Sequence, residues 1–158
     1  MKKSILSSTL FAFVLLVFMA SCQQPQVFSE KKVFENQIWN RFDFLEYDFL
    51  IENPDITYDV SLGFTHLNAY YTDHLTANIT FFMPDGSMRS RDYTFKLKNA
   101  QLEWLGINEK GIINHQLSVI EGIKFPEKGN YKIRVESKMP KFNLEHIKTV
   151  ELIISPSK

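Results

Sequence analysis

The sequence predicts an all-β protein: an antiparallel β-sandwich of about seven to eight strands, placed after a signal peptide and a short tether. Three observations predict it. Apolar and polar residues alternate with a period of two through most of residues 33–158, and turn residues separate the alternating stretches. No window of about 12 residues has the period of an amphipathic helix.

The N-terminus has the pattern of a bacterial lipoprotein signal. Lys2 and Lys3 precede an apolar run from Ile5 to Met19, and a small-residue cleavage site ends on Cys22. A transmembrane helix needs about 20 apolar residues, and the hydroxyl residues in this run make it too short. A cleaved secretory signal fits the length but would leave Cys22 as a lone thiol. We therefore expect residues 1–21 to be removed and Cys22 to carry acyl chains that attach the protein to a membrane.

Residues 22–32 are predicted to be a lipidated tether, because they are polar and show no hydrophobic period. Residues 33–158 are long enough for one hydrophobic core and are predicted to form a single domain. The chain has 18 basic and 18 acidic side chains, so no strong field attracts nucleic acid, and we expect no nucleic-acid partner. Cys22 is the single cysteine, which excludes disulfides, cysteine-ligated zinc and thiol catalysis from the folded domain.

The predicted strands follow one another in a regular order. Asn53-Pro54-Asp55 turns the chain after the first of them. Pro84-Asp85-Gly86 predicts a tight hairpin turn, since proline fixes one φ angle and glycine accepts a positive one. A strand is also expected over 112–120. The inward-facing residues, strand by strand, are Leu45, Tyr47, Phe49 and Ile51; Ile56, Tyr58, Val60, Leu62 and Phe64; Leu75, Ala77, Ile79 and Phe81; Tyr93, Phe95 and Leu97; Leu117 and Val119; Tyr131, Ile133 and Val135; and Val150, Leu152 and Ile154.

The titratable residues form no recognisable catalytic or metal motif. The four histidines, at positions 66, 74, 115 and 146, lack the short spacing that lets two imidazoles of one element share a metal. We expect them to be unpaired surface residues, although a site assembled from distant strands stays open. Asp73-His74 lacks the Gly-x-Ser-x-Gly turn that would indicate a hydrolase. No cofactor, metal or catalytic residue is therefore predicted.

Two pairs of acidic residues could in principle perform acid and base chemistry on a sugar. They are Asp43 with Glu46, and Asp48 with Glu52. Charges that alternate along the wet face of a strand explain both pairs more simply.

Aromatic residues make up 14% of the chain, and exposed rings often stack on a glycan or fill a pocket of a partner protein. We expect Trp39 and Trp104 to pack in or against the core. Tyr70 and Tyr71 lie in the predicted loop from Leu67 to His74, where burial is less expected. They are the candidate partner-binding residues.

The order of several motifs along the chain resembles that of a known family, the gliding-motility-associated lipoproteins of Bacteroidetes (the GldH type). The resemblance covers the chain after Cys22, and it ends with a methionine, a leucine and a short apolar strand at Met139, Leu144 and 147–150. The earlier motifs are Trp39 with Phe42 and Phe44; a strand opened by Tyr58; Tyr70-Tyr71; Pro84-Asp85-Gly86; and Phe125-Pro126-Glu127-Lys128-Gly129-Asn130-Tyr131.

The resemblance implies a non-enzymatic envelope lipoprotein that is needed for gliding, acts as a scaffold or assembly component, and associates with the machinery of type IX secretion. Its partners would be the membrane, through the lipid anchor, and other envelope proteins. In such bacteria an acidic cluster after the cysteine directs lipoproteins to the cell exterior. Residues 23–26 here are uncharged, which favours an outer-membrane anchor facing the periplasm. The alternative is a surface lipoprotein that binds glycans or processes polysaccharides, because a β-sandwich hosts both functions.

Overall fold

The computed structural model describes residues 27–158, and every regular element in this part of the chain is a β-strand. Its strands, in chain order, are β1 (Phe28–Val33), β2 (Ile38–Asn40), β3 (Leu45–Ile51), β4 (Tyr58–Leu67), β5 (His74–Phe82), β6 (Met88–Lys96), β7 (Ile107–Glu109), β8 (Ile112–Ile123), β9 (Gly129–Ser137), β10 (Asn143–Glu145) and β11 (Ile147–Pro156).

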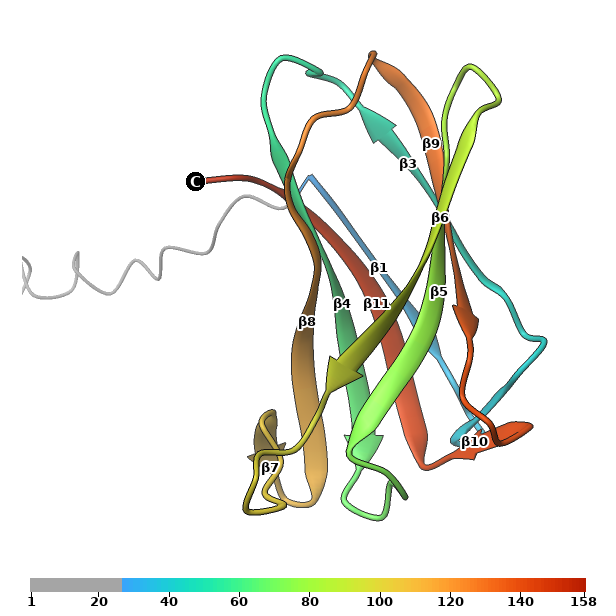
Figure 1. The fold of residues 1–158 in the computed structure, drawn as a ribbon, viewed down its shortest axis with the longest axis vertical. Coiled ribbons are helices and arrows are strands. Elements are labelled where there is room, and N and C mark those ends of the chain that lie inside the picture. The colour runs from blue at the N-terminus through green and yellow to red at the C-terminus, as the bar shows by residue number, and fades with distance from the viewer. Residues whose placement is uncertain (1–26) are drawn as a thin grey trace, which may run out of the picture.

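Two antiparallel sheets face each other and form the predicted β-sandwich (Figure 1). The five-stranded sheet has the order β1-β11-β4-β8-β7, and the four-stranded sheet has the order β3-β9-β5-β6. β2 and β10 form a separate two-stranded sheet at one end of the sandwich (Figure 1). All the pairings are antiparallel, as the turn-rich sequence predicted.

The structure corrects the boundary of the predicted tether. Residues 28–32 belong to β1, which pairs with β11 from Phe28 opposite Ile154 to Val33 opposite Thr149. β1 lies at the edge of its sheet and is held mainly by backbone hydrogen bonds, so polar side chains are tolerated along it. For this reason the strand could not be predicted from an alternating pattern. The Phe28 ring also packs on Phe49, with ring centroids 5.7 Å apart. The described fold therefore begins earlier than position 33.

The long strands agree with the sequence prediction, whereas the additional short ones do not appear in it. β2, β7 and β10 have three residues each, which is too short for an alternating pattern to be read. Nearly all of the predicted inward residues are buried in the core. Two are not: Tyr93 is only partly buried, and Ile56 precedes β4 and is 38% exposed. The core also takes in residues outside the predicted series, among them Phe125 and Met139.

Two tyrosines of the four-stranded sheet bury their rings in the core. Tyr47 on β3 is fully buried, and its hydroxyl donates a hydrogen bond to the carbonyl oxygen of Val150 on β11, 3.0 Å away in the facing sheet. Tyr131 on β9 buries its ring against Phe125, and its hydroxyl donates to the carbonyl oxygen of Glu127 at 2.7 Å. Each ring therefore contributes apolar area without leaving its hydroxyl unpaired.

The Pro84-Asp85-Gly86 hairpin is confirmed. The amide of Met83 donates to the carbonyl oxygen of Ser87, and Gly86 has a φ of 83°, a left-handed conformation that glycine adopts without steric cost. This turn joins β5 to β6 along nine residue pairs, from His74 opposite Lys96 to Phe82 opposite Met88. It therefore places β6 at the edge of the four-stranded sheet.

Candidate functional site

Four aromatic side chains project into solvent at the end of the sandwich that carries β2 and β10. They come from three loops: one between β2 and β3, one between β4 and β5, and one before β10. The residues are Phe42, Phe44, Tyr71 and Phe142, which are 66%, 48%, 41% and 59% exposed, and we call them the aromatic surface. The rings of Phe42 and Phe142 meet edge to face with centroids 5.5 Å apart. Lys141, next to Phe142 in the chain, holds its ammonium 4.2 Å from the centre of the Tyr71 ring.

Local hydrogen bonds fix two of these loops, the one between β2 and β3 and the one before β10. The amide of Arg41 donates to the carbonyl oxygen of Phe142 at 2.8 Å, which extends the pairing of β2 with β10. The indole N–H of Trp39 donates to the carbonyl oxygen of Asp43 at 2.8 Å. Trp39 is fully buried, as predicted, and its ring occupies the interior at this end. Phe42 and Phe44 project outward from the loop that Trp39 holds.

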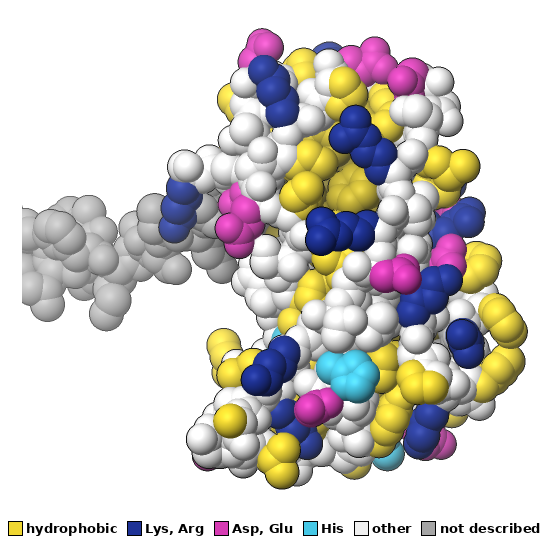
Figure 2. Space-filling view, viewed as in Figure 1, with side chains coloured by type: hydrophobic (Ala, Val, Ile, Leu, Met, Phe, Trp, Pro, Cys, Tyr) yellow, Lys and Arg dark blue, Asp and Glu magenta, His cyan; other side chains and the backbone are white. Residues whose placement is uncertain are grey.

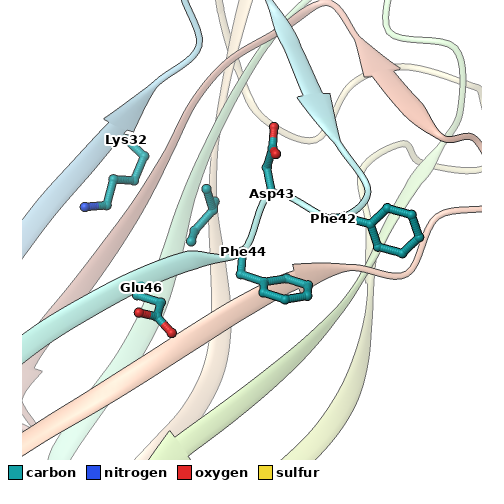
Figure 3. A pocket seen from close by; sticks show the side chains of 6 residues that line it. Lys32, Phe42, Asp43, Phe44 and Glu46 are labelled. Carbon is teal, nitrogen blue, oxygen red and sulfur yellow. The ribbon is translucent and has the colours of Figure 1, made fainter.

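A shallow depression lies beside Phe42 and Phe44, between them and β1 (Figure 3). Lys32, Asp43, Leu45 and Glu46 complete its lining. The carboxylates of Asp43 and Glu46 point in different directions in Figure 3 and do not converge on a common point. The Asp43 carboxylate accepts a hydrogen bond from the side-chain amide of Asn40 at 2.8 Å.

The second acidic residue in this depression, Glu46, is engaged in ion pairs. It accepts two hydrogen bonds from the Arg134 guanidinium, at 2.9 and 2.7 Å, and one from Lys132 at 3.2 Å. The hydrogen bonds from Arg134, followed by those from Lys132, lower the pKa of the Glu46 carboxyl. A carboxyl group that acts as the general acid on a sugar needs a raised pKa. The pKa of Glu46 is lowered, which does not suit that role.

The other acidic residues considered as catalysts also lie beside lysines, Asp48 on the outer face of β3 and Glu52 directly after that strand. Asp48 is 3.8 Å from the ammonium of Lys132, and Glu52 is 2.5 Å from that of Lys128. These contacts favour the simpler interpretation, in which the carboxylates belong to the solvated surface.

The structure separates the two tyrosines that the sequence grouped together. Tyr71 is exposed, but Tyr70 is only 3% exposed and belongs to the core, so its prediction as an exposed binding residue is wrong. The Tyr70 hydroxyl donates to the carbonyl oxygen of His74 at 3.1 Å, and its ring lies 4.9 Å from that of His66. The two rings still meet edge to face, with centroids 5.5 Å apart, so the exposed Tyr71 ring borders the buried Tyr70 ring.

Tyr70 covers a pair of buried histidines, His66 on β4 and His115 on β8. Their Nε2 atoms are 3.1 Å apart, although the residues are separated by 49 positions in the chain. The Nδ1 of His66 lies 2.8 Å from the carbonyl oxygen of Leu67, which can only accept, so Nδ1 carries the proton. The Nε2 of His66 therefore accepts a hydrogen bond from the Nε2–H of His115.

Burial keeps both imidazoles neutral. Desolvation, followed by the proximity of His66, lowers the pKa of His115 from 6.5 to about 4. Desolvation also lowers the pKa of His66. The prediction of unpaired surface histidines is wrong for these two. The alternation of buried and exposed residues along each strand could have predicted their burial. His66 continues the inward series of β4 beyond Phe64. His115 lies on the same face of β8 as Leu117 and Val119.

Trp104 closes this cluster from the side, as the predicted packing against the core requires. Its ring lies 4.5 Å from that of His66, and its indole N–H donates to the side-chain oxygen of Asn68 at 2.7 Å. The other two histidines lie elsewhere: His74 contacts Asp73, and His146 sits in a turn with a φ of 69°. Within residues 27–158, no group of three or more His, Cys, Asp or Glu side chains is arranged to hold a metal ion.

The predicted lipidation site, Cys22, lies outside the described residues. In the described range, no helix has the length and apolar character that crossing a membrane requires.

By sequence, the chain is similar to a protein family and to an individual protein. The model of the GldH lipoprotein family matches residues 26–154. The gliding motility lipoprotein GldH homolog of Christiangramia forsetii is 26% identical over 141 residues, which cover 88% of this chain and 84% of that protein.

Two solved structures are more distantly similar. A carbohydrate-binding module specific for non-crystalline cellulose has 11% identity and a TM-score of 0.43, over 82% of this chain and 73% of that one. Dimeric latent PorU from Porphyromonas gingivalis has 6% identity and a TM-score of 0.34, over 88% of this chain and 14% of that one. The family match, by contrast, extends from before β1 into β11 and takes in both sheets. The chain therefore belongs to the GldH lipoprotein family.

Proposed function

We propose that this lipoprotein is a non-enzymatic scaffold or assembly component of the gliding motility and type IX secretion-associated machinery, and that it binds a protein partner through the aromatic surface. Membership of a lipoprotein family means that the chain is anchored to a membrane of the cell envelope. We further propose that this membrane is the outer membrane and that the domain faces the periplasm, because uncharged residues follow Cys22.

The exposed rings of Phe42 and Phe142 carry this proposal. Aromatic side chains of this kind supply large contact areas at low cost in conformational entropy, and they are frequent hot spots of protein interfaces. The loops that hold them are tied together by backbone hydrogen bonds, so little order has to be gained on binding. Lys141, whose ammonium lies beside the ring of Tyr71, adds a cation that can meet an acidic group of a partner.

The same geometry is less suited to the glycan-binding alternative. Sugar rings stack on flat, exposed aromatic faces, whereas Phe42 and Phe142 meet edge to face and have no polar atom to bond a hydroxyl. Trp39 is buried, and Trp104 is engaged with His66 and Asn68. The acidic residues near the surface are held in ion pairs or local hydrogen bonds.

Complementation of a deletion strain tests the proposal in a gliding host. Deletion should abolish movement, and the wild-type gene should restore it. The double variant Phe42→Ser, Phe142→Ser should accumulate in the envelope at normal level but fail to restore movement or to retain envelope partners in affinity capture. The matched control is Leu105→Ser, Ile107→Ser, which removes two residues that are equally exposed, at 57% and 69%, but lie in and before β7.

Three results would contradict the proposal. If the aromatic double variant restores full motility, the aromatic surface is not needed for the function. Loss of motility in the control alone would move the binding surface to β7. Binding to insoluble polysaccharide that depends on Phe42 would favour the glycan alternative.

The anchor requires a separate test, because Cys22 lies outside the described residues. If Cys22 is acylated, Cys22→Ala should move the protein from the membrane to the soluble envelope fraction, since no other hydrophobic attachment is predicted. Retention of the variant in the membrane fraction would show that another segment holds the protein there.

A further inference from the structure

β6 has one free edge. It is the last strand of the four-stranded sheet and pairs with β5 on one side, while no strand of residues 27–158 pairs with its other side. Such a strand presents backbone N–H and C=O groups to which another extended chain can add.

Two arginines lie on the inner face of this edge strand. Arg89 pairs across the sheet with Phe81, and Arg91 pairs with Ile79, and both of these β5 residues are buried in the core. Directly paired residues of antiparallel strands point to the same face, so the two arginines point toward the facing sheet and not away from it. The next residue on this face, Tyr93, stacks on Phe95, whose burial confirms the direction.

The two sheets leave an apolar groove open beneath these arginines. It has a volume of about 270 Å³ and lies between the four-stranded sheet and β8. Figure 2 shows hydrophobic atoms in the hollow between β6 and β8, with Lys or Arg side chains lying across it. Its apolar lining consists of Ile79, Phe81, Met83, Tyr93, Ile120 and Ile123.

No carboxylate compensates the two arginines. Neither Arg89 nor Arg91 forms an ion pair with any residue of the described part of the chain. The Arg91 guanidinium instead lies 5.3 Å from the centre of the Tyr93 ring. Guanidinium groups bind carboxylates bidentately, and they do so more strongly beside an apolar surface than in open water. The groove therefore combines a free strand edge, an apolar floor and two unused cations.

We propose that β6 accepts an extended segment of a partner protein as an additional strand, with Asp or Glu at positions i and i+2 opposite Arg89 and Arg91. The spacing follows from the strand period, because side chains two residues apart share a face. Apolar side chains of the same segment on this face cover the groove. This inference goes beyond the proposed function, since the strand edge is a different surface from the aromatic surface.

A second copy of this chain is a poor occupant. Pairing β6 with its own counterpart would gather four guanidinium groups from the two copies on one face, and like charges that face each other across strands are destabilising. An anionic lipid could use the groove and the arginines, but it would leave the backbone edge unpaired. An acidic extended segment uses all three features.

A peptide titration tests the proposal with the full-length protein in a non-ionic detergent. The probes are two labelled nine-residue peptides composed mainly of threonine. Each carries glutamates at positions i and i+2 and valines at the next two alternate positions. The second peptide has the sequence of the first in reverse order. One of them should bind, with an affinity that falls as salt rises. Arg89→Gln, Arg91→Gln should weaken this binding about tenfold or more, whereas Lys96→Gln, on the outward face of the same strand, should change it less than about twofold.

Changes in the peptide keep the test valid even if the arginine variant folds poorly. Replacing both glutamates with glutamine should weaken binding to the wild-type protein to a similar extent. Two further peptides are N-methylated at alternate backbone nitrogens, one at the odd positions and one at the even positions. Only one of these two sets of amides faces β6, so one peptide should lose binding and the other should keep it.

Three outcomes would overturn the proposal. The first is that neither peptide binds, and the second is that methylation has the same effect in both phases. The third is that the affinity for dodecanoate depends on Arg89 and Arg91 while the affinity for the peptides does not. That result would assign the groove to an anionic amphiphile. The first outcome has a specific explanation if the arginine variant also self-associates in sedimentation. In that case the arginines only protect the edge from aggregation.

Discussion

Two groups of aromatic residues at one end of the sandwich differ in what their rings contact. In the buried cluster, Tyr70 and Trp104 pack on the two histidines, and the polar atoms of both rings have partners inside the protein. On the aromatic surface, all four rings remain at least 41% exposed. Phe42 contacts Phe142, whereas Tyr71 contacts Lys141 and the Tyr70 ring, whose centroid is 5.5 Å away. Tyr70 and Tyr71 are adjacent in the sequence and yet belong to different groups. Position relative to the sheets, and not residue type, therefore separates rings that stabilise the fold from rings available to a partner.

The largest difference should appear when the two adjacent tyrosines are each replaced by alanine. Tyr70→Ala should lower the free energy of unfolding by about 3 to 5 kcal/mol, because it leaves a cavity beside His66 and Phe64. Tyr71→Ala should change it by less than about 0.5 kcal/mol. Urea unfolding measures both values. Equal losses for the two variants would show that the comparison between the groups is wrong.

The histidine pair should make the buried cluster sensitive to acid. The pKa of His115 falls from 6.5 to about 4 on folding, so between these pH values the unfolded chain binds more protons than the folded one. The contribution to stability is complete above about pH 6.5 and is lost as the pH falls toward 4, by up to about 3 kcal/mol. His115→Gln keeps a donor for His66 and should reduce this pH dependence in unfolding curves recorded at each pH. An unchanged slope would mean that other groups cause it.

The loop that closes the cluster depends on a glycine. A Cβ at Gly106 would lie 2.5 Å from the carbonyl oxygen of Asn114 and 2.9 Å from the Nδ1 of His115. Gly106→Ala should therefore lower the free energy of unfolding by about 1 to 3 kcal/mol, because backbone must move away. Its exposed neighbour offers a matched control, since Leu105→Ala should cost less than about 0.5 kcal/mol. Chemical unfolding would refute the contact if the two variants were equally stable.

The smallest effect on stability is expected on the aromatic surface itself. Phe42→Ala removes one edge-to-face contact with Phe142 and little buried area, so it should cost about 1 kcal/mol or less. Thermal unfolding should show a midpoint close to that of the wild-type protein. A loss as large as that of Tyr70→Ala would place Phe42 in the fold and weaken its assignment to partner binding.

Several features of the fold could be read from the chain because they are local. The strand of Tyr131, Ile133 and Val135 shows its buried face by alternation, and the hairpin at 84–86 follows from the dihedral preferences of its residues. β1 could not be read, because its polar side chains carry no period and its stability comes from pairing with β11.

The candidate sites depended on long-range contacts to a greater degree. His66 and His115 meet because β4 pairs with β8 in one register, and no spacing rule covers residues so far apart. Phe42 meets Phe142 because β2 pairs with β10. The burial of Tyr70 could not be predicted, because its position between two strands gives no sign that the ring turns inward.

By itself, the sequence determined the all-β class, the inward residues of the long strands and the resemblance to a lipoprotein family, because alternation, turn chemistry and motif order are properties of the linear chain. Only the tertiary structure decided which aromatic rings are buried, which histidines are hydrogen-bonded to each other, and that Arg89 and Arg91 face an open groove. These outcomes depend on strand register and on the packing of one sheet against the other. Both are set by the summed burial of residues far apart in the chain, so no local pattern specifies them.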